Sequence, residues 1–461
     1  MKKILFLVLT IILGISFVYA QDDYLQKWKN DNISIEAARH MLQVDDGLIV
    51  GGYDHDFVVQ LAKYDDTGKE VKTLKLDYEG TVCGFYEKDG KYYFITTNDD
   101  NWWEVMVYEI TSDLTIVRKK ATSYHMEEWN EQTELVGDKL YITTTGFGKV
   151  GGIFDDDDNY YDYFSINLVD FSVEAGNNEE WNFGVFGTEI QNNIKLNDAG
   201  IPGIVIKEKG DLTVVGGKMS PYDDSEGFIR FFNKTSNIVE DYDNNKFINE
   251  KLLTAGHWYT RIALLEDYII AGGENYQAID FFTYDGKYVD SINLVEELYE
   301  SSVDKTYIQI EDIIYMKGRI SVAYQVCDIV NDCPIGCKSG IAVFHKKYNI
   351  ATKTDGNGIV KSATNSEYGS EEVSFSIEPN EGYVIKTVKI TDKDGNVITY
   401  TKDDVKGNKF KMPYADVTIE VEFEPKNPET LAGVAIFGSF IILIVSFMVA
   451  VINIKKAREL L

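Results

Sequence analysis

Hydrophobic positions recur in six similar segments between residues 48 and 344 of the chain. Each segment holds a short apolar strand, a break rich in Gly or Asp, a second strand rich in apolar and aromatic residues, and then a tight turn and a third strand. Hairpin signals such as Asp89-Gly90 and Lys317-Gly318 lead into these segments. The pattern predicts repeated antiparallel β-structure, with the paired runs 48–52 and 57–64, 92–96 and 103–110, 140–143 and 163–169, 212–217 and 228–232, 268–273 and 278–284, and 320–324 and 341–344.

The spacing of the repeats indicates a propeller. Their first runs begin at residues 48, 92, 140, 212, 268 and 320, which suits propeller blades with inserted loops better than helical solenoids. Closing such blades into a ring removes exposed strand edges and keeps a long all-β chain soluble. We expect a six-bladed β-propeller over residues 21–346, or a seven-bladed one if 174–207 forms another blade. A pair of irregular β-sandwiches is the alternative.

Glycine pairs give this region a family resemblance. Three segments end a strand with a diglycine, and two carry Tyr-Asp on the next strand. In these features the region, about 36–346, resembles kelch-type and related bacterial β-propeller repeats. The residues concerned are Gly51-Gly52, Gly216-Gly217 and Gly272-Gly273, and then Tyr64-Asp65 and Tyr284-Asp285.

A different alternation of strands and turns begins at about Lys347. A Pro…Glu-Gly-Tyr order at 379–383 is followed by Phe410-Lys-Met-Pro413 and by the alternating run 417–423. The stretch 347–424 resembles the divergent internalin-type bacterial repeat domain. That resemblance implies a stalk or spacer module on a surface protein, and it implies no catalytic residue.

The N-terminus has the pattern of a signal peptide. Lys2 and Lys3 precede an uncharged run that starts at Ile4 and closes with Val18-Tyr19-Ala20. Small residues at such positions are read by a signal peptidase, so we expect residues 1–20 to be removed. An uncleaved anchor helix is the alternative, and with either one the bulk of the chain is exported.

The C-terminus has the pattern of a membrane anchor. No charged residue occurs in 431–454, a stretch long enough to cross a bilayer as one transmembrane helix. The basic residues that follow predict a short cytoplasmic tail, 455–461. After a linker at 425–430, the protein would therefore be a single-pass type I protein of the cell membrane with 21–430 outside.

A short motif precedes the apolar stretch. Asn427, Pro428, Glu429 and Thr430, followed by an apolar run and a basic tail, resemble a sortase cell-wall sorting signal. The family expects Gly next, where this chain has Leu431, so we regard the motif as a degenerate one and favour a retained anchor. Both interpretations place the protein on the cell surface.

The charge balance excludes some partners. The 461 residues include 45 Lys and Arg against 75 Asp and Glu, a formal net charge of −30. Such a surface repels the phosphate backbone, which argues against a nucleic-acid partner, and it also disfavours adhesion to anionic lipid.

Acidic and sulfur ligands suggest two candidate sites. The oxygen ligands of Asp155, Asp156, Asp157, Asp158 and Asp162 gather on one stretch, where Ca²⁺ could bridge them; a solvated acidic loop is the alternative. Cys83, Cys327, Cys333 and Cys337 are disulfide candidates, because three of them lie within eleven residues of an exported chain. Unpaired thiols, or a zinc set completed by His345, are the other interpretations.

Aromatic residues are the main lead to a ligand. Trp102, Trp103, Tyr160, Tyr161 and Trp258 are expected in or beside loops, where their faces could stack on sugars or anchor a protein. Packing in the core is the alternative. No His-Glu-x-x-His, Gly-x-Ser-x-Gly or Walker sequence occurs, so no catalytic residue is assigned.

The sequence therefore predicts a membrane-anchored bacterial surface protein whose propeller binds a glycan or a protein partner. The alternative function is that of a propeller-type hydrolase or lyase acting on extracellular polysaccharide, since a spatial pair of carboxylates leaves no sequence signature.

Overall fold

The computed structural model confirms an all-β protein. Strands form nearly all of its regular structure; one short helix, α5 (Leu294–Tyr299), and one 3-10 turn, η1 (Asp99–Asn101), are the exceptions within the described ranges. Two compact units divide the chain at Lys346/Lys347, and each is described by itself. The described residues are 24–126, 131–144, 153–155, 160–161, 163–176, 205–218, 227–233, 238–243, 259–273, 276–301, 305–330, 333–403 and 407–426.

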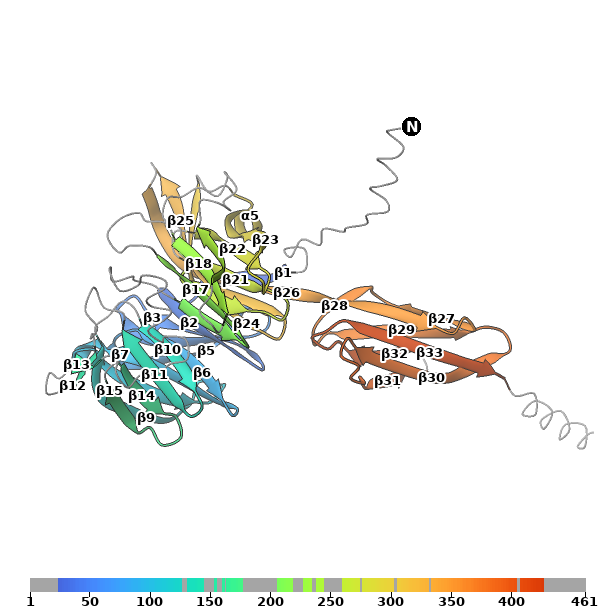
Figure 1. The fold of residues 1–461 in the computed structure, drawn as a ribbon, viewed down its shortest axis with the longest axis horizontal. Helices are drawn as coiled ribbons and strands as arrows, with labels where there is room; N and C mark the ends of the chain where they lie inside the picture. Colours follow the sequence, from blue (N-terminus) through green and yellow to red (C-terminus); the bar gives the residue numbers. More distant parts are fainter. Residues whose placement is uncertain are drawn as a thin grey trace, which may run out of the picture. The chain divides into compact units, whose positions relative to one another are not determined.

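Unit 1 consists of six antiparallel sheets that repeat one strand order (Figure 1). We number these sheets 1 to 6 and call their strands first to fourth. They are β2 (Ala37–Val44), β3 (Gly47–Tyr53), β4 (Val58–Tyr64) and β5 (Glu70–Glu79); β6 (Val82–Lys88), β7 (Lys91–Asn98), β8 (Glu104–Ile110) and β9 (Ile116–Met126); β10 (Glu131–Val136), β11 (Lys139–Thr144), β14 (Tyr163–Asn167) and β15 (Val173–Gly176); β16 (Val205–Lys209), β17 (Leu212–Lys218), β18 (Gly227–Asn233) and β19 (Ile238–Asp243); β20 (Arg261–Leu264), β21 (Ile269–Gly273), β22 (Tyr276–Phe282) and β23 (Tyr288–Asn293); and β24 (Thr306–Met316), β25 (Arg319–Val330), β26 (Cys333–Thr354) and β1 (Tyr24–Asn30).

The repeated part of each sheet has four strands, where the hydrophobic pattern predicted three. The predicted apolar runs are the second and third strands, which neighbouring sheets cover on both faces. The first strands carry charged residues such as Arg39 in β2, Lys207 in β16 and Arg261 in β20. They also contribute buried apolar residues, such as Met41 and Ile310, to the clusters between sheets, so the charged positions interrupt their apolar pattern.

The first strands lie next to one another in series. Strand β10 contacts β6, β6 contacts β2, β2 contacts β24, β24 contacts β20, and β20 contacts β16. Buried apolar clusters fill the space between successive sheets. Ile49 and Leu61 of sheet 1 pack with Phe94 and Tyr108 of sheet 2, and similar clusters join sheets 2 and 3, 4 and 5, 5 and 6, and 6 and 1.

The two ends of each sheet differ in their connections. One end, which we call the turn end, carries tight turns such as Asp89-Gly90, where both residues have positive φ and Gly is therefore favoured at the second position. Turn ends of neighbouring sheets are bonded together, as in the Lys317–Asp45 ion pair of 2.9 Å between sheets 6 and 1. Lys209 Nζ likewise donates to the Leu265 carbonyl, 3.0 Å away, between sheets 4 and 5. The opposite end, the loop end, holds the longer connections, from second to third strand and from one sheet to the next.

The N-terminal strand completes the last sheet. Strand β1 pairs antiparallel with β26, from Tyr24 opposite Lys346 to Asn30 opposite Ile341. Just after β1, the carboxylate of Asp31 accepts hydrogen bonds of 2.7 Å from the hydroxyls of both Tyr299 and Tyr324. The first and last parts of unit 1 are thus joined by a backbone ladder and by a side-chain cluster.

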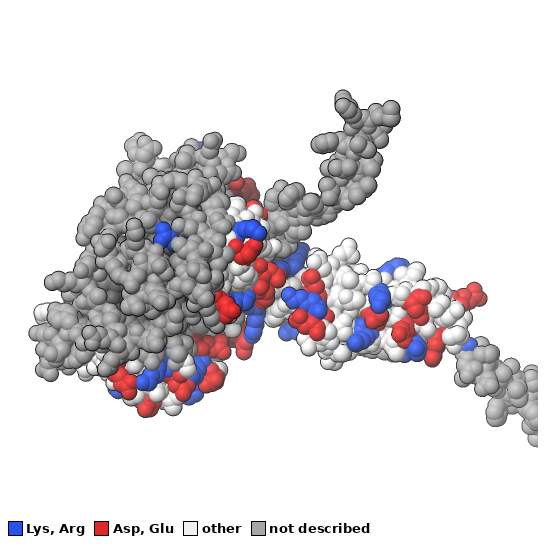
Figure 2. All heavy atoms as spheres, in the orientation of Figure 1, with Lys and Arg blue, Asp and Glu red and all other residues white. Residues whose placement is uncertain are grey.

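Unit 2 is a two-sheet sandwich. One sheet contains β28 (Ser366–Tyr368), the part of β26 after Lys346, β33 (Val417–Pro425) and β30 (Tyr383–Asp392), with β26 and β33 parallel. The other contains β27 (Gly358–Ser362), β29 (Glu372–Pro379), β32 (Gly407–Lys411) and β31 (Tyr400–Asp403). Its core includes Phe375, Phe410, Ile419 and Phe423. Figure 2 shows acidic and basic side chains mixed over the face of this unit in view.

The predicted terminal elements lie outside the described residues. They are the signal peptide 1–20, the sorting motif 427–430, the apolar stretch 431–454 and the tail 455–461. Over the part of the chain that is described, no helix has the length and apolar character needed to span a membrane.

Replacing Asp31 tests the joint between the two ends of unit 1. D31A would leave two largely buried tyrosine hydroxyls without their acceptor, so we expect the free energy of unfolding to fall by about 1–3 kcal/mol in urea at neutral pH. D45A removes the exposed carboxylate of the Lys317–Asp45 pair and is the control, for which we expect little change.

The same variant predicts a pH dependence. Burial acts to raise the pKa of Asp31, but hydrogen bonds from Tyr324 and Tyr299 and the charge of Lys29 outweigh it and hold the pKa below its usual value of 3.8. A lowered pKa stabilises the fold above the unfolded value and stops doing so as the pH falls through the folded value. The difference between wild type and D31A should therefore shrink below pH 3.8. A constant difference down to full protonation would contradict the role of the carboxylate.

Candidate functional site

Two exposed aromatic residues lie at the loop end, one in sheet 1 and one in sheet 2. Phe57 and Trp102 are 61% and 74% exposed, and each follows a second strand in a backbone conformation with positive φ. Hydrogen bonds tie the two loops together through the link from β5 to β6: Gly80 N donates to the Phe57 carbonyl (3.0 Å) and Glu79 N to Asp100 Oδ2 (3.4 Å).

The loop that carries Trp102 and Trp103 is fixed at four points. Glu104, which is buried, accepts from Asn101 Nδ2 (2.7 Å) and from Ser123 N (3.1 Å). The carbonyl of Trp102 lies 2.9 Å from His125 Nδ1, which places the proton of that bond on Nδ1, and the carbonyl of Trp103 accepts from Met126 N (3.1 Å). Because these bonds hold the backbone, the loop presents the Trp102 indole to solvent in a defined place.

An insertion from sheet 3 joins the same place. Strands β12 (Ile153–Asp155) and β13 (Tyr160–Tyr161) come from the connection between β11 and β14, yet they pair with β9 of sheet 2. Phe154 lies opposite His125 and also opposite Tyr160. The backbone of the predicted ligand residues Asp155, Tyr160 and Tyr161 is therefore brought beside the Trp102 loop.

Other predicted site residues cannot be placed. Asp156, Asp157, Asp158, Asp162 and Trp258 lie outside the described residues. Among the side chains that are described, no three His, Cys, Asp or Glu are arranged to hold a metal ion. The calcium site at the acidic stretch stays a prediction.

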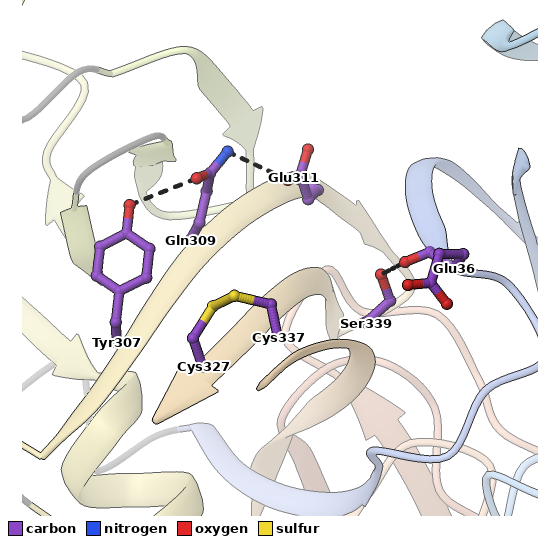
Figure 3. The surroundings of a disulfide bond; sticks show 7 residues. All are labelled: Glu36, Tyr307, Gln309, Glu311, Cys327, Cys337 and Ser339. Carbon is purple, nitrogen blue, oxygen red and sulfur yellow. Dashed lines mark hydrogen bonds between the residues drawn. A yellow bond between two sulfur atoms is a disulfide. The ribbon is translucent and has the colours of Figure 1, made fainter. Parts of the chain in front are cut away.

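A row of hydrogen-bonded polar side chains, Tyr307, Gln309 and Glu311, follows the first strand of sheet 6 (Figure 3). On β24, the Tyr307 hydroxyl donates to Gln309 Oε1 (3.4 Å), and Gln309 Nε2 donates to Glu311 Oε1 (3.2 Å). Glu311 Oε2 pairs with Arg39 Nη1 at 3.0 Å. Arg39 also donates to the hydroxyl of Tyr53 (3.5 Å), whose ring centroid is 5.4 Å from that of Phe57.

The cysteines resolve into one disulfide. Cys327 and Cys337 are bonded across the hairpin of β25 and β26, with their Cα atoms 4.1 Å apart (Figure 3). The zinc set proposed from Cys327, Cys333, Cys337 and His345 is thereby excluded, because two of its thiolates are consumed. Cys83 was a disulfide candidate and is corrected: it is buried in β6 and is not disulfide-bonded. The side chain of Cys333 lies outside the described residues.

The sequence did not single out Phe57, Glu104, His125 or Arg39. Phe57 had a usable signal, since it occupies the same place between second and third strands as Trp102 does in the next repeat. His125, Glu104 and Arg39 had none, because their partners come from other strands.

Comparison with known proteins identifies no family. No protein-family model matches the chain, and no curated protein matches it. A solved structure that resembles it is the crystal structure of a protein of unknown function from Bacteroides caccae, with a TM-score of 0.35, 8% sequence identity, and coverage of 59% of this chain and 86% of that chain. A likeness this weak carries no argument.

Removing Glu104 tests the fixed tryptophan loop. E104A deprives the Ser123 amide and the Asn101 side chain of their acceptor, so we expect hydrogen exchange at the Ser123 amide to speed up by about tenfold or more. E79A removes an exposed carboxylate nearby and should leave that amide unchanged. Equal exchange in E104A and wild type would mean that Glu104 does not hold the loop.

The disulfide gives a second prediction. The C327S/C337S double variant should lose about 2–3 kcal/mol of unfolding free energy under oxidising conditions. Reductant should lower the stability of wild type to a similar extent and leave the double variant unaffected. Peptide mapping that joined Cys333 or Cys83 to either partner would contradict the assignment.

Proposed function

We propose that the chain is a membrane-anchored bacterial surface protein that binds a glycan at the loop end of a six-bladed β-propeller. The observation that carries the proposal is the exposed pair Phe57 and Trp102, held beside the inserted hairpin of Tyr160 and Tyr161. Exposed apolar side chains clustered on one surface mark interaction sites. Aromatic faces on rigidly held loops suit the flat apolar faces of sugar rings.

Closure into a propeller is supported by the order of the sheets. First strands contact one another in series from β10 to β16, so a single further contact, between sheets 3 and 4, would complete a ring. The pairing of β1 with β26 completes the fourth position of sheet 6, as ring closure requires of a sheet shared between the two ends of the chain.

The predicted terminal segments support a location outside the cell. The chain leaves unit 1 at Lys346, whose amide donates to the Gly318 carbonyl (2.8 Å) in a turn at the turn end. The two exposed aromatic residues lie at the loop end of the same unit. A signal peptide, a spacer module like unit 2 and an anchor at 431–454 would together place unit 1 outside the cell membrane.

Binding by the Trp102 variant tests the proposal. The full chain, purified in mild detergent, is applied to an array of glycans and envelope proteins. We expect W102A to weaken binding to the recognised glycan by at least about tenfold. V169A removes an apolar side chain that is 63% exposed on a turn at the turn end, and it is the matched control that should bind like wild type.

Three other outcomes would redirect the assignment. Binding only to envelope proteins would replace the glycan with a protein partner. New reducing ends released during the assay would indicate a polysaccharide-acting enzyme. Equal binding by W102A and wild type would remove the aromatic pair from the site. Repeating the array with a chelator tests the predicted calcium requirement at the acidic stretch.

A further inference from the structure

Cationic side chains from three different sheets meet where the first strands come together. Arg39 lies on β2, Lys207 on β16 and Arg261 on β20. Arg39 pairs with the Glu311 side chain of β24 at 3.0 Å, and Arg261 Nε donates to the main-chain carbonyl of the same residue. Two guanidinium groups thus approach Glu311 from neighbouring sheets on either side.

Strand β16, which carries Lys207, contacts β20, which carries Arg261, and the charge of Lys207 also acts on His40. Burial, followed by the charges of Arg261, Arg39 and Lys207, lowers the pKa of His40 to about 3. The imidazole is therefore neutral at physiological pH and adds no charge. Its environment is positive because three cations act on it at once.

The carboxylates that face this cluster are already engaged. Glu311 is bonded by Arg39 and Gln309. Asp312 is buried and accepts from Met41 N (2.8 Å) and Ile313 N (2.9 Å). Burial raises the pKa of Asp312, against the opposing charges of Arg261 and Lys207. The two described carboxylates are thus satisfied, Asp312 by main-chain donors and Glu311 by side chains.

Arg261 has donors directed at weak partners. Among the described residues it donates to the carbonyls of Glu311 and Thr260, and no described carboxylate forms an ion pair with it. The Thr260 hydroxyl beside it is 5% exposed and has no hydrogen-bond partner within the described structure. A guanidinium carries five donors in a fork that fits carboxylate or sulfate, so the Arg261 side chain can bind an anion by donating hydrogen bonds to it.

We propose that the glycan bound by this protein is acidic, and that Arg39, Lys207 and Arg261 bind its carboxylate or sulfate groups where the first strands meet. This inference rests on the proposed function and names the ligand class of the same loop-end site. The polar row from Glu311 through Arg39 and Tyr53 to Phe57 connects the cationic cluster to the aromatic pair. One saccharide could therefore use both, with its rings on the aromatics and its charged group on the cations.

The net charge of −30 makes the cluster selective. The protein as a whole repels anions over long range, and that repulsion is screened within roughly 8 Å at physiological salt. A local group of cations acts at shorter range and attracts an anion that reaches it. Binding should therefore demand correct placement of the charged group and should tolerate no generic polyanion.

Matched glycans and matched variants test the inference. The probes are oligogalacturonate with its methyl ester and chondroitin sulfate with its desulfated form, added to a panel of neutral and acidic glycans. We expect the full chain to bind the charged member of a recognised pair at least about tenfold more tightly than the uncharged one. R261Q should abolish that difference, and K207Q should reduce it.

The control is K72Q, which removes one cation from the outer strand β5 of sheet 1 and should keep the full difference. W102A should weaken charged and uncharged members alike, which separates the aromatic pair from the cationic cluster. Urea unfolding verifies that each variant folds, and K207Q, whose side chain is exposed, decides the question if R261Q does not fold.

Two results would overturn the inference, and they differ in what they leave standing. Equal binding of charged and neutral members, unaffected by R261Q and K207Q, would refute the acidic ligand while the glycan function stands. Failure to bind any glycan on the panel would refute both.

Discussion

Every strand in unit 1 needs a partner on each side or a covered edge, and the pairing of β1 with β26 meets that need where the chain begins and ends. Without β1, the third strand of sheet 6 would present a long row of unsatisfied amides and carbonyls to solvent. The same pairing places Asp31 against Tyr299 and Tyr324. It also holds sheet 6 against sheet 1, where the Ser339 hydroxyl donates to the Glu36 carbonyl (2.6 Å) and Glu311 meets Arg39. The position of the cationic cluster thus depends on a backbone ladder made elsewhere in the sheet.

Hydrophobic periodicity found the parts of the fold that are buried on both faces. The second and third strands, such as β3 and β4 with buried Ile49 and Leu61, were predicted because neighbouring sheets cover them. The first strands were missed for a physical reason. Charged residues such as Arg39 and Arg261 stand among buried apolar ones such as Ile262, so the apolar pattern of these strands is short and interrupted. The all-β class could be predicted, while the number of strands in each sheet could not.

For the candidate site, the sequence could likewise indicate single residues but not the contacts between distant segments. Exposed aromatics could be nominated from composition, and Trp102 is indeed exposed. Strands β12 and β13 lie between β11 and β14 of sheet 3 in the sequence, yet β12 pairs with β9 of sheet 2. Nothing in the local sequence of these segments indicates this pairing. The pairing of the cysteines also depends on contacts between strands. Their close spacing suggested a short-range bond, but the pairing of Cys327 with Cys337 depends on the register of β25 and β26, which shifts between Val326 and Asp328.

The pairing of β1 with β26 also affects how the chain folds during synthesis. The ribosome makes β1 first, and its partner in β26 appears only after a separation of 341 − 30 = 311 residues. The entropy cost of closing a loop rises by only about 0.6 kcal/mol for each doubling of its length. The long separation therefore affects the time at which β1 can pair more than the stability of the pairing. Contacts this distant in sequence slow folding. Strand β1 therefore lacks its partner until β26 has been made. The five intervening sheets can fold before β1 pairs with β26 and covers the edge of that strand.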